Sequence, residues 1–272
     1  AMIAHTALNE SYLDSAQVRA NVVSHAKSLG YTPRSRTAAE AKVNIVFNAK
    51  AGVNSYSIPS NTQFTALVGE KTHTFLTIDS TDNVSAVGGQ FEFTDVRLRQ
   101  GVNRTQTFTV NNQTNQRYVI QDKNIDTSTI KVRVFDSLTS NSSQTYTLAT
   151  TLSTITGNTP VYYINENSNG NYEIYFGNGV YGKRPNTSGR IVVSYVATNG
   201  AEANGANTFV YADTSASVNI NSVSAVESAS GGSFKENKES IKFHAPLLFT
   251  SQDRAVTSSD YKALVKGNIE GL

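Results

Sequence analysis

The sequence predicts an α+β fold that is mainly β. We expect a helix at the N-terminal end, central antiparallel β domains of sandwich or barrel-like form, and a helical segment at the C-terminal end. Apolar residues near the start recur at helical spacing. Short runs of Val, Ile, Tyr and Phe then follow one another about every ten residues, separated by Asn, Ser and Thr turn signals. Helix-capping spacing returns after Gly231-Gly232.

The expected N-terminal helix lies between Leu8 and Leu29, and Gly30 follows it at the usual place of a left-handed cap. Its apolar stripe is narrow and padded with alanine, so the helix needs a partner surface from its own domain or from another chain. The stripe consists of Val18, Val22, His25 or Ala26, and Leu29.

After Pro33 the apolar period changes to two, and Val43, Ile45 and Phe47 describe a strand with one drier face. Similar runs with turn residues between them predict further strands. Their even spacing indicates an antiparallel sandwich or barrel-like body rather than alternating β and α units. We expect these strands at Gln90–Leu98, Gln106–Val110, Arg117–Ile120, Lys131–Phe135, Gln144–Thr150, Val161–Asn165, Tyr172–Phe176, Arg190–Val196 and Asn207–Tyr211.

Capping-box spacing marks two helices near the C-terminal end. Ser233 with Glu236 predicts the start of a helix that continues to about Phe249. Thr257 with Asp260 predicts a second, short helix.

Composition excludes several classes of function. The formal net charge is only +2, and the basic residues are scattered among carboxylates, so we do not expect a nucleic-acid partner. The absence of cysteine excludes a disulfide framework and thiolate-ligated zinc. No apolar run reaches the roughly 18–20 residues that span a bilayer, so we expect no membrane partner. The basic residues Arg34, Arg36 and Lys42 are interpreted as a solvated surface.

The segment Gly177-Asn178-Gly179-Val180-Tyr181-Gly182 matches the G-x-G-x-x-G pattern of dinucleotide sites. In those sites the glycines let a pyrophosphate reach the N-terminus of a following helix. Here residues 183–189 lead instead into the predicted strand at Ile191-Val192-Val193. We therefore interpret the segment as a glycine-rich connection between strands.

The spacing of histidines and carboxylates predicts neither a metal site nor a catalytic site. His5, His25, His73 and His244 lie far apart, and none has a metal-ligand spacing with another histidine or a carboxylate. No nucleophile elbow is present, and no pair of carboxylates stands in a recognisable glycosidase setting. We expect no catalytic, cofactor-binding or metal-ligating residues, no cofactor, no small-molecule substrate and no enzymatic activity.

Tyrosines gather in the second half of the chain. Alternation along strands would put some of the rings in the core and leave others to shield the opposite face. The alternative is an aromatic platform for a glycan or a protein. These residues are Tyr162, Tyr163, Tyr172, Tyr175 and Tyr181.

Three stretches, in this order, together resemble the baseplate J family of contractile-tail phages, as found in the baseplate wedges of T-even phages. The stretches are Leu29-Gly30-Tyr31-Thr32-Pro33 with the Ile58-Pro59 turn, then Phe176-Gly177-Asn178-Gly179-Val180-Tyr181-Gly182-Lys183-Arg184-Pro185 with the loop of residues 199–205, and finally Ser230-Gly231-Gly232 with Ala245-Pro246-Leu247 and Arg254-Ala255-Val256-Thr257. The family often has Asp where Asn178 stands, and little in it matches residues 81–158.

The resemblance implies a structural subunit of the virion tail baseplate, assembled in the cytoplasm of the host bacterium. Such a subunit associates with itself, as a dimer or a ring of copies, and with other wedge proteins, and it connects the tail hub to the sheath. Large buried interfaces can supply the affinity of such an assembly without any titrating site.

The chain resembles a piece of a longer protein, because Ala1-Met2 looks like a cloning scar and no terminating element precedes Leu272. We expect four parts. They are an N-terminal docking helix (1–30), a baseplate J-like β body (31–80 and 159–230), an inserted or extra β domain (81–158) and a truncated C-terminal helical segment (231–272).

Two other functions remain open. A tail or surface adhesin, or another carbohydrate-binding module, would present a cluster of tyrosines around a groove. A glycoside hydrolase would need two carboxylates about 5–10 Å apart in a cleft.

Overall fold

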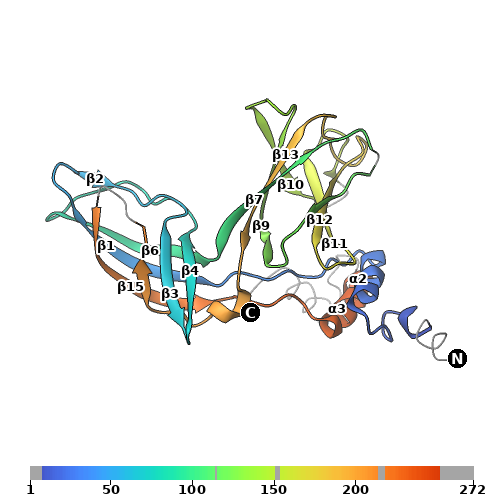
Figure 1. Ribbon diagram of the computed structural model, residues 1–272, viewed down its shortest axis with the longest axis horizontal. Coiled ribbons are helices and arrows are strands. Elements are labelled where there is room, and N and C mark those ends of the chain that lie inside the picture. The colour runs from blue at the N-terminus through green and yellow to red at the C-terminus, as the bar shows by residue number, and fades with distance from the viewer. Residues whose placement is uncertain (1–7, 114, 151–153, 214–217, 252–272) are drawn as a thin grey trace.

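A computed structural model describes residues 8–113, 115–150, 154–213 and 218–251. Two β sheets form separate bodies, and two helices pack together below the second body, as Figure 1 shows. The first sheet lies on the left of that view and the second at the upper right. The predicted fold class, α+β and mainly β, is confirmed. None of the described helices is long and apolar enough to cross a membrane.

The first sheet is antiparallel throughout and has the order β14-β3-β4-β6-β1-β15. A small two-stranded sheet, β2 with β5, lies beside it. The bounds are β1 Glu40–Ala49, β2 Ser55–Tyr56, β3 Gln63–Val68, β4 Lys71–Thr77, β5 Val84–Ser85, β6 Gln90–Gln100, β14 Phe209–Tyr211 and β15 Val218–Ser230.

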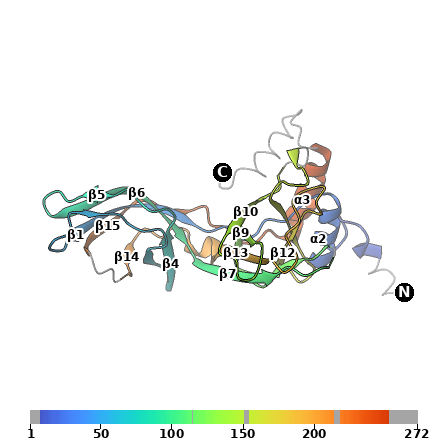
Figure 2. The same cartoon turned by 90° about the horizontal axis from the view of Figure 1, so that it is seen from above.

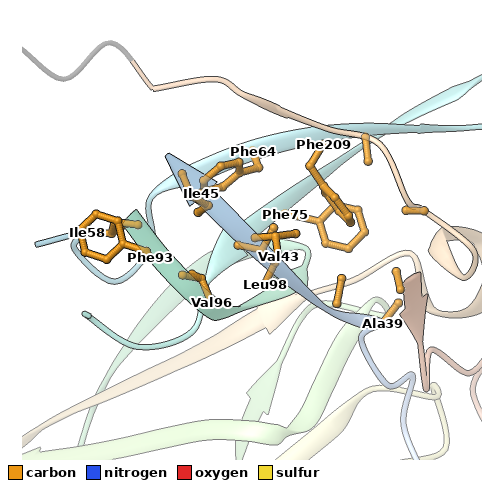
Figure 3. Close-up of a cluster of buried hydrophobic side chains, with 14 of the residues drawn as sticks. Ala39, Val43, Ile45, Ile58, Phe64, Phe75, Phe93, Val96, Leu98 and Phe209 are labelled. Carbon is orange, nitrogen blue, oxygen red and sulfur yellow. The ribbon is translucent and has the colours of Figure 1, made fainter. Parts of the chain in front are cut away.

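Aromatic and branched side chains fill the core of the first body (Figure 3). Alternation along β1 buries Val43, Ile45 and Phe47 completely, as the period of two predicts. Phe75 and Phe209 meet edge to face with their ring centroids 5.1 Å apart. This contact ties β4 to the short outer strand β14, and Phe47 on β1 packs edge to face on Tyr211 of β14 with centroids 5.3 Å apart.

The second sheet has the order β7-β13-β9-β10-β11-β12-β8. It curves around its own core of tyrosine, isoleucine and valine side chains. All its pairs are antiparallel except β10 with β11, which is parallel. The bounds are β7 Val102–Thr109, β8 Tyr118–Ile120, β9 Ile125–Phe135, β10 Ser143–Leu148, β11 Val161–Glu166, β12 Tyr172–Phe176 and β13 Arg190–Ala197.

The strand β15 is the longest in the structure, and sequence patterning missed it. It lies at an edge of the first sheet, and almost all of its side chains are exposed on both faces. Register shifts along its pairing with β1 disturb the alternation further. A strand without one buried face has no hydrophobic period to detect.

The N-terminal helix α2 is shorter than the expected one: it spans Arg19–Ser28, and among the described residues before it only residues 8–10 are also helical. Its end is a Schellman motif, in which Tyr31 N donates to Ala26 O at 2.9 Å and Gly30 N donates to Lys27 O at 3.0 Å. Gly30 has φ +79°, so the predicted left-handed cap is confirmed.

The C-terminal helix, α3, spans Lys238–Ser251. Its cap is Asn237, whose Oδ1 accepts from Ser240 N at 2.8 Å, so the predicted Ser233 cap is wrong. Ser233 instead exchanges two backbone hydrogen bonds with Thr37. The second predicted helix, at residues 257–265, lies outside the described residues.

Helices α2 and α3 share a small apolar core of their own. Val22 and Ala26 on α2 face Ile241 and Ala245 on α3, and all four side chains are fully buried. This contact supplies the partner surface that the narrow stripe of the N-terminal helix requires.

The chain enters the second sheet at Gly101 and leaves it near Asn199, so residues of the first sheet flank the second on both sides in sequence. The segments 31–39 and 231–237 run antiparallel from the first sheet past the second to the helices (Figure 1). The division into parts at residues 30, 80, 158 and 230 stays a prediction.

Gly101 lies where the chain passes from the first sheet into the second, and its substitution tests how tightly the backbone packs there. Its φ is +136°, and a Cβ there would lie 2.4 Å from Val196 Cγ1 and 2.6 Å from Ala197 O. We predict that Gly101→Ala lowers the free energy of unfolding by about 3 kcal/mol or more, from backbone strain together with overpacking. Urea unfolding followed by circular dichroism measures it.

The matched control is Gly69→Ala, in the turn between β3 and β4. Gly69 has φ +60° with open space around its Cβ, so only the backbone cost of about 1–2 kcal/mol applies. Equal losses in the two variants would contradict the close packing at Gly101.

Candidate interaction surfaces

The glycine-rich segment 177–182 connects β12 to β13, as predicted. It is a tight loop in which Gly179 N donates to Gly182 O at 3.0 Å. A Cβ on Gly177 would lie 2.2 Å from Gly182 O, so glycine is needed here for the loop to close on itself. The backbone groups of Gly179 and Gly182 are hydrogen-bonded within the loop, and a strand rather than a helix follows. The segment therefore lacks the helix N-terminus that a dinucleotide site uses.

The histidines lie at separate places. His25 Nε2 is 2.9 Å from Glu10 O, and His244 Nδ1 is 2.9 Å from Ser240 O within α3. His73 is buried on β4, and His5 lies outside the described residues. Among the described residues, no three His, Asp or Glu side chains are grouped so that they could hold a metal ion.

The tyrosines divide between two faces of the second sheet. Tyr162 and Tyr172 are buried in its core. Tyr163 on β11 and Tyr175 on β12 lie opposite each other on the other face, with ring centroids 5.2 Å apart and planes 19° apart. Arg117 stacks on Tyr175 at 4.1 Å from the ring centroid.

The three basic residues 34, 36 and 42 are partly exposed, and each has a partner. Arg36 Nη1 donates to Asn199 O at 3.1 Å, and Lys42 forms a 2.8 Å ion pair with Glu227. Arg34 Nη2 lies 3.9 Å from a carboxylate oxygen of Glu236.

Two buried carboxylates hold the helices to the second sheet. We call Glu166, Glu236, Arg19, Lys235 and Tyr31 the junction cluster. Glu166, the last residue of β11, is 3% exposed, and it accepts from Arg19 Nε at 3.1 Å and Nη2 at 3.0 Å. Lys235 Nζ lies 3.0 Å from the same carboxylate. The pair of nitrogens on Arg19 makes this a bidentate, charge-assisted contact.

Glu236, in the segment just before α3, completes the junction cluster. Its carboxylate accepts from Tyr31 Oη at 2.9 Å, Arg34 N at 3.0 Å and Ser240 Oγ at 2.7 Å. The Arg19 guanidinium also donates to the backbone oxygen of Glu236. One arginine thus joins α2, β11 and the segment that precedes α3.

Burial shifts the pKa of three side chains in and beside the junction cluster, Tyr31, Tyr172 and Lys235. Burial, and then the Glu236 charge, raise the pKa of Tyr31, and burial followed by the Glu166 charge does the same for the pKa of Tyr172. Both hydroxyls therefore stay protonated donors, and Tyr172 Oη donates to Pro33 O at 3.0 Å. Burial also lowers the pKa of Lys235.

A second buried network fixes the crossing between the two sheets. Gln100, 2% exposed at the end of β6, accepts from Thr198 Oγ1 at 2.6 Å and from Asn199 N at 2.9 Å. Asp126 on β9 accepts from Ala38 N at 2.9 Å. Both contacts join residues of one sheet to segments leading into the other.

Exposed apolar side chains gather at the helical end of the molecule. This end projects beyond the second sheet, and Figure 2 shows it at the right, near the N-terminus. Large apolar side chains outside the small helical core are more than half exposed here. They are Leu8, Tyr12, Val18, Phe243 and Phe249.

Sequence reasoning missed the junction cluster. The sequence marks Glu236 as a cap candidate and as part of the third stretch that resembles the baseplate J family, but nothing in it marks Arg19, Glu166 or Lys235. Arg19 and Glu166 are 147 positions apart, and nothing local distinguishes either one.

Removing one charge from the junction cluster tests its contribution. We predict that Glu166→Gln lowers the free energy of unfolding by about 2–3 kcal/mol, because it leaves two cations without their carboxylate. The loss stays below that of a fully buried pair, since Arg19 and Lys235 are partly exposed. Urea unfolding measures it, and hydrogen exchange should show the loss of protection first in α2 and α3.

The matched control is Glu227→Gln, which breaks the exposed pair with Lys42. Its unfolding midpoint should equal that of the wild type. A Glu166→Gln midpoint equally unchanged would show that the junction cluster does not hold the helices.

Three of the matches of this chain among known proteins come from baseplates. Residues 102–204, which include the whole second sheet, match the family described as bacteriophage baseplate wedge protein gp6, third domain. The chain is 28% identical over 284 aligned residues to baseplate wedge protein gp6 of Enterobacteria phage T4, with 96% of this chain and 42% of that protein covered. The chain thus spans less than half the length of this curated relative.

The third match is a chain in the cryo-EM structure of the anti-feeding prophage baseplate. It has 12% sequence identity and a TM-score of 0.36, and the match covers 94% of this chain and 48% of that one. The predicted resemblance to a contractile-tail phage baseplate wedge subunit is confirmed by the sequence matches. The chain is similar to phage baseplate wedge protein gp6, and its residues 102–204 match the family model of the gp6 third domain.

Proposed function

We propose that this chain is part of a structural, non-enzymatic subunit of a contractile-tail baseplate wedge. The similarity to a wedge protein along 96% of the chain carries the proposal. In this role the subunit associates with copies of itself and with neighbouring wedge proteins, and it links the tail hub to the sheath. It is assembled in the host cytoplasm and resides in the virion tail baseplate.

The two buried networks support a spacer function. An assembly that transmits position needs bodies at a fixed distance and angle, and buried polar groups with satisfied hydrogen bonds favour one arrangement over others. The Gln100 contacts join the two sheets, and the junction cluster joins the helices to the second sheet. Each part is therefore fastened to the next.

The helical end is the docking surface in this proposal. Burying one exposed Leu or Phe side chain contributes about 1.5–3 kcal/mol, so several together can supply much of an interface. Interfaces of standard size have apolar, aromatic-rich centres, a composition that Tyr12, Phe243 and Phe249 share. Repeated copies close into a ring only if the rotation between neighbours closes.

The competing functions have less support. The larger surface cavity, beside Tyr163 and Tyr175, has no Asp or Glu among its described lining residues, so it lacks the paired carboxylates of a glycoside hydrolase. Tyrosines do line this cavity, as a carbohydrate-binding module would require, but Tyr175 is covered by its neighbours. Nucleic acid, membranes and small-molecule substrates have no place in the proposal.

Co-sedimentation tests the docking surface. We predict that a Phe243→Ser/Phe249→Ser variant, co-expressed with the products of the neighbouring wedge genes, is lost from the large complex that the wild-type chain forms. Removing two exposed aromatic anchors deprives the interface of its apolar centre.

The matched control is Leu67→Ser/Val210→Ser, which changes equally exposed side chains on the first sheet. It should sediment with the complex as the wild type does. A wild-type chain that remains a lone monomer beside its neighbours would contradict the wedge proposal itself.

A further inference from the structure

An open cavity of about 760 Å³ lies against the β8, β12 and β11 strands of the second sheet. It is separate from the apolar helical end, although Lys27 at the end of α2 reaches one side of it. Tyr163, Tyr175 and Arg117 line it, and Arg184 lies in the segment that follows the glycine-rich loop. These four side chains belong neither to the junction cluster nor to the network around Gln100 and Asp126.

The side chains of three neighbouring strands form one row in this cavity. Tyr163 and Tyr175 are register partners on β11 and β12. Arg117 immediately precedes β8, whose Tyr118 pairs with Ile174 of β12, so Arg117 stands opposite Tyr175. Tyr175 is therefore flanked by Tyr163 on one neighbouring strand and by Arg117 on the other.

This row decides what kind of ligand fits. Sugar-binding platforms offer open aromatic faces, whereas Tyr175 has one face against Tyr163 and the other against Arg117. The Tyr163 hydroxyl donates to Tyr181 O at 3.3 Å, so the cationic groups and the Tyr175 hydroxyl are the donors that face a ligand. Donors and positive charge suit an anionic partner.

The charge of the cavity lining also favours an anionic partner. Its described lining contains three cations, Lys27, Arg117 and Arg184, and no carboxylate. Glu173, largely buried beside them, lies 3.7 Å from Lys27 and 3.2 Å from Arg117. Three positive charges against one negative leave an excess of two. No described carboxylate lies within 4.0 Å of Arg184, so its charge is open to a ligand.

We infer that this cavity binds an acidic, extended peptide segment of a neighbouring wedge protein. The inference rests on the proposed function, and it names the chemistry of one partner. Carboxylates of the segment pair with Arg184 and with the free donors of Arg117 and Lys27. The side-chain amides of Asn165 and Asn178, which also line the cavity, can bind the backbone of the segment.

Fluorescence anisotropy with the full chain tests the inference. The probe is a fluorescein-labelled peptide of alternating Glu and Gly, and the same peptide with Gln in place of Glu is the neutral reference. We expect the Glu peptide alone to bind at low ionic strength, and salt to weaken it. Arg184→Ser should weaken binding about three- to fivefold, as loss of one partly exposed ion pair allows.

The matched control is Arg133→Ser, which removes the same charge from an exposed position on β9 away from the cavity. It should bind the peptide as tightly as the wild type. Equal weakening in the two variants would show non-specific attraction and overturn the inference. Binding of maltohexaose that Tyr163→Ala abolishes, with no binding of the Glu peptide, would overturn it in favour of sugar recognition.

The co-sedimentation experiment separates this inference from the proposed function. If the wild-type chain joins the wedge complex but does not bind the Glu peptide, only the cavity inference fails. If it binds the peptide but never joins the complex, the wedge proposal fails.

Discussion

The arrangement of this molecule depends on two carboxylates, Glu166 and Glu236, taken out of water where the helices meet the second sheet. Neither can remain buried as an anion without donors around it. Arg19, Lys235, Tyr31 and the backbone N–H of Arg34 supply those donors from three separate segments of the chain. The position of the helices follows from where these donors must stand.

Buried polar groups with satisfied hydrogen bonds also fix the places where the chain passes between the two sheets. The second sheet is inserted between β6 and β14 of the first, so the chain must cross between the bodies several times. At those crossings Gln100 and Asp126 accept hydrogen bonds from the passing backbone. Gly101 allows the first crossing because no side chain fits beside Val196. A spacer with such joints holds its docking surface at a defined place, as the wedge proposal requires.

Sequence patterning predicted those features that a local period or a turn determines. The alternation of Val43, Ile45 and Phe47 is that of one buried face, and the bounds of the strand at Tyr172–Phe176 were predicted correctly. The strand β15 was not predicted, because an edge strand exposed on both faces has no alternation of apolar and polar residues. The cap of α3 was misplaced because Ser233 and Asn237 are both good caps, and pairing with Thr37 already occupies Ser233. The junction cluster could not be predicted, since its members meet only in the folded chain.

The central claim is that the two β bodies are held at one distance and angle. The chain has no cysteine, so a Glu92→Cys/Thr145→Cys variant offers exposed spin-label sites, one on each sheet, without further changes. Double electron–electron resonance between the two labels measures the distance between the bodies directly. A single narrow distance distribution, unchanged by moderate urea below the unfolding transition, is the result that a rigid spacer predicts. A broad or two-peaked distribution under native conditions would contradict it and show that the bodies move independently.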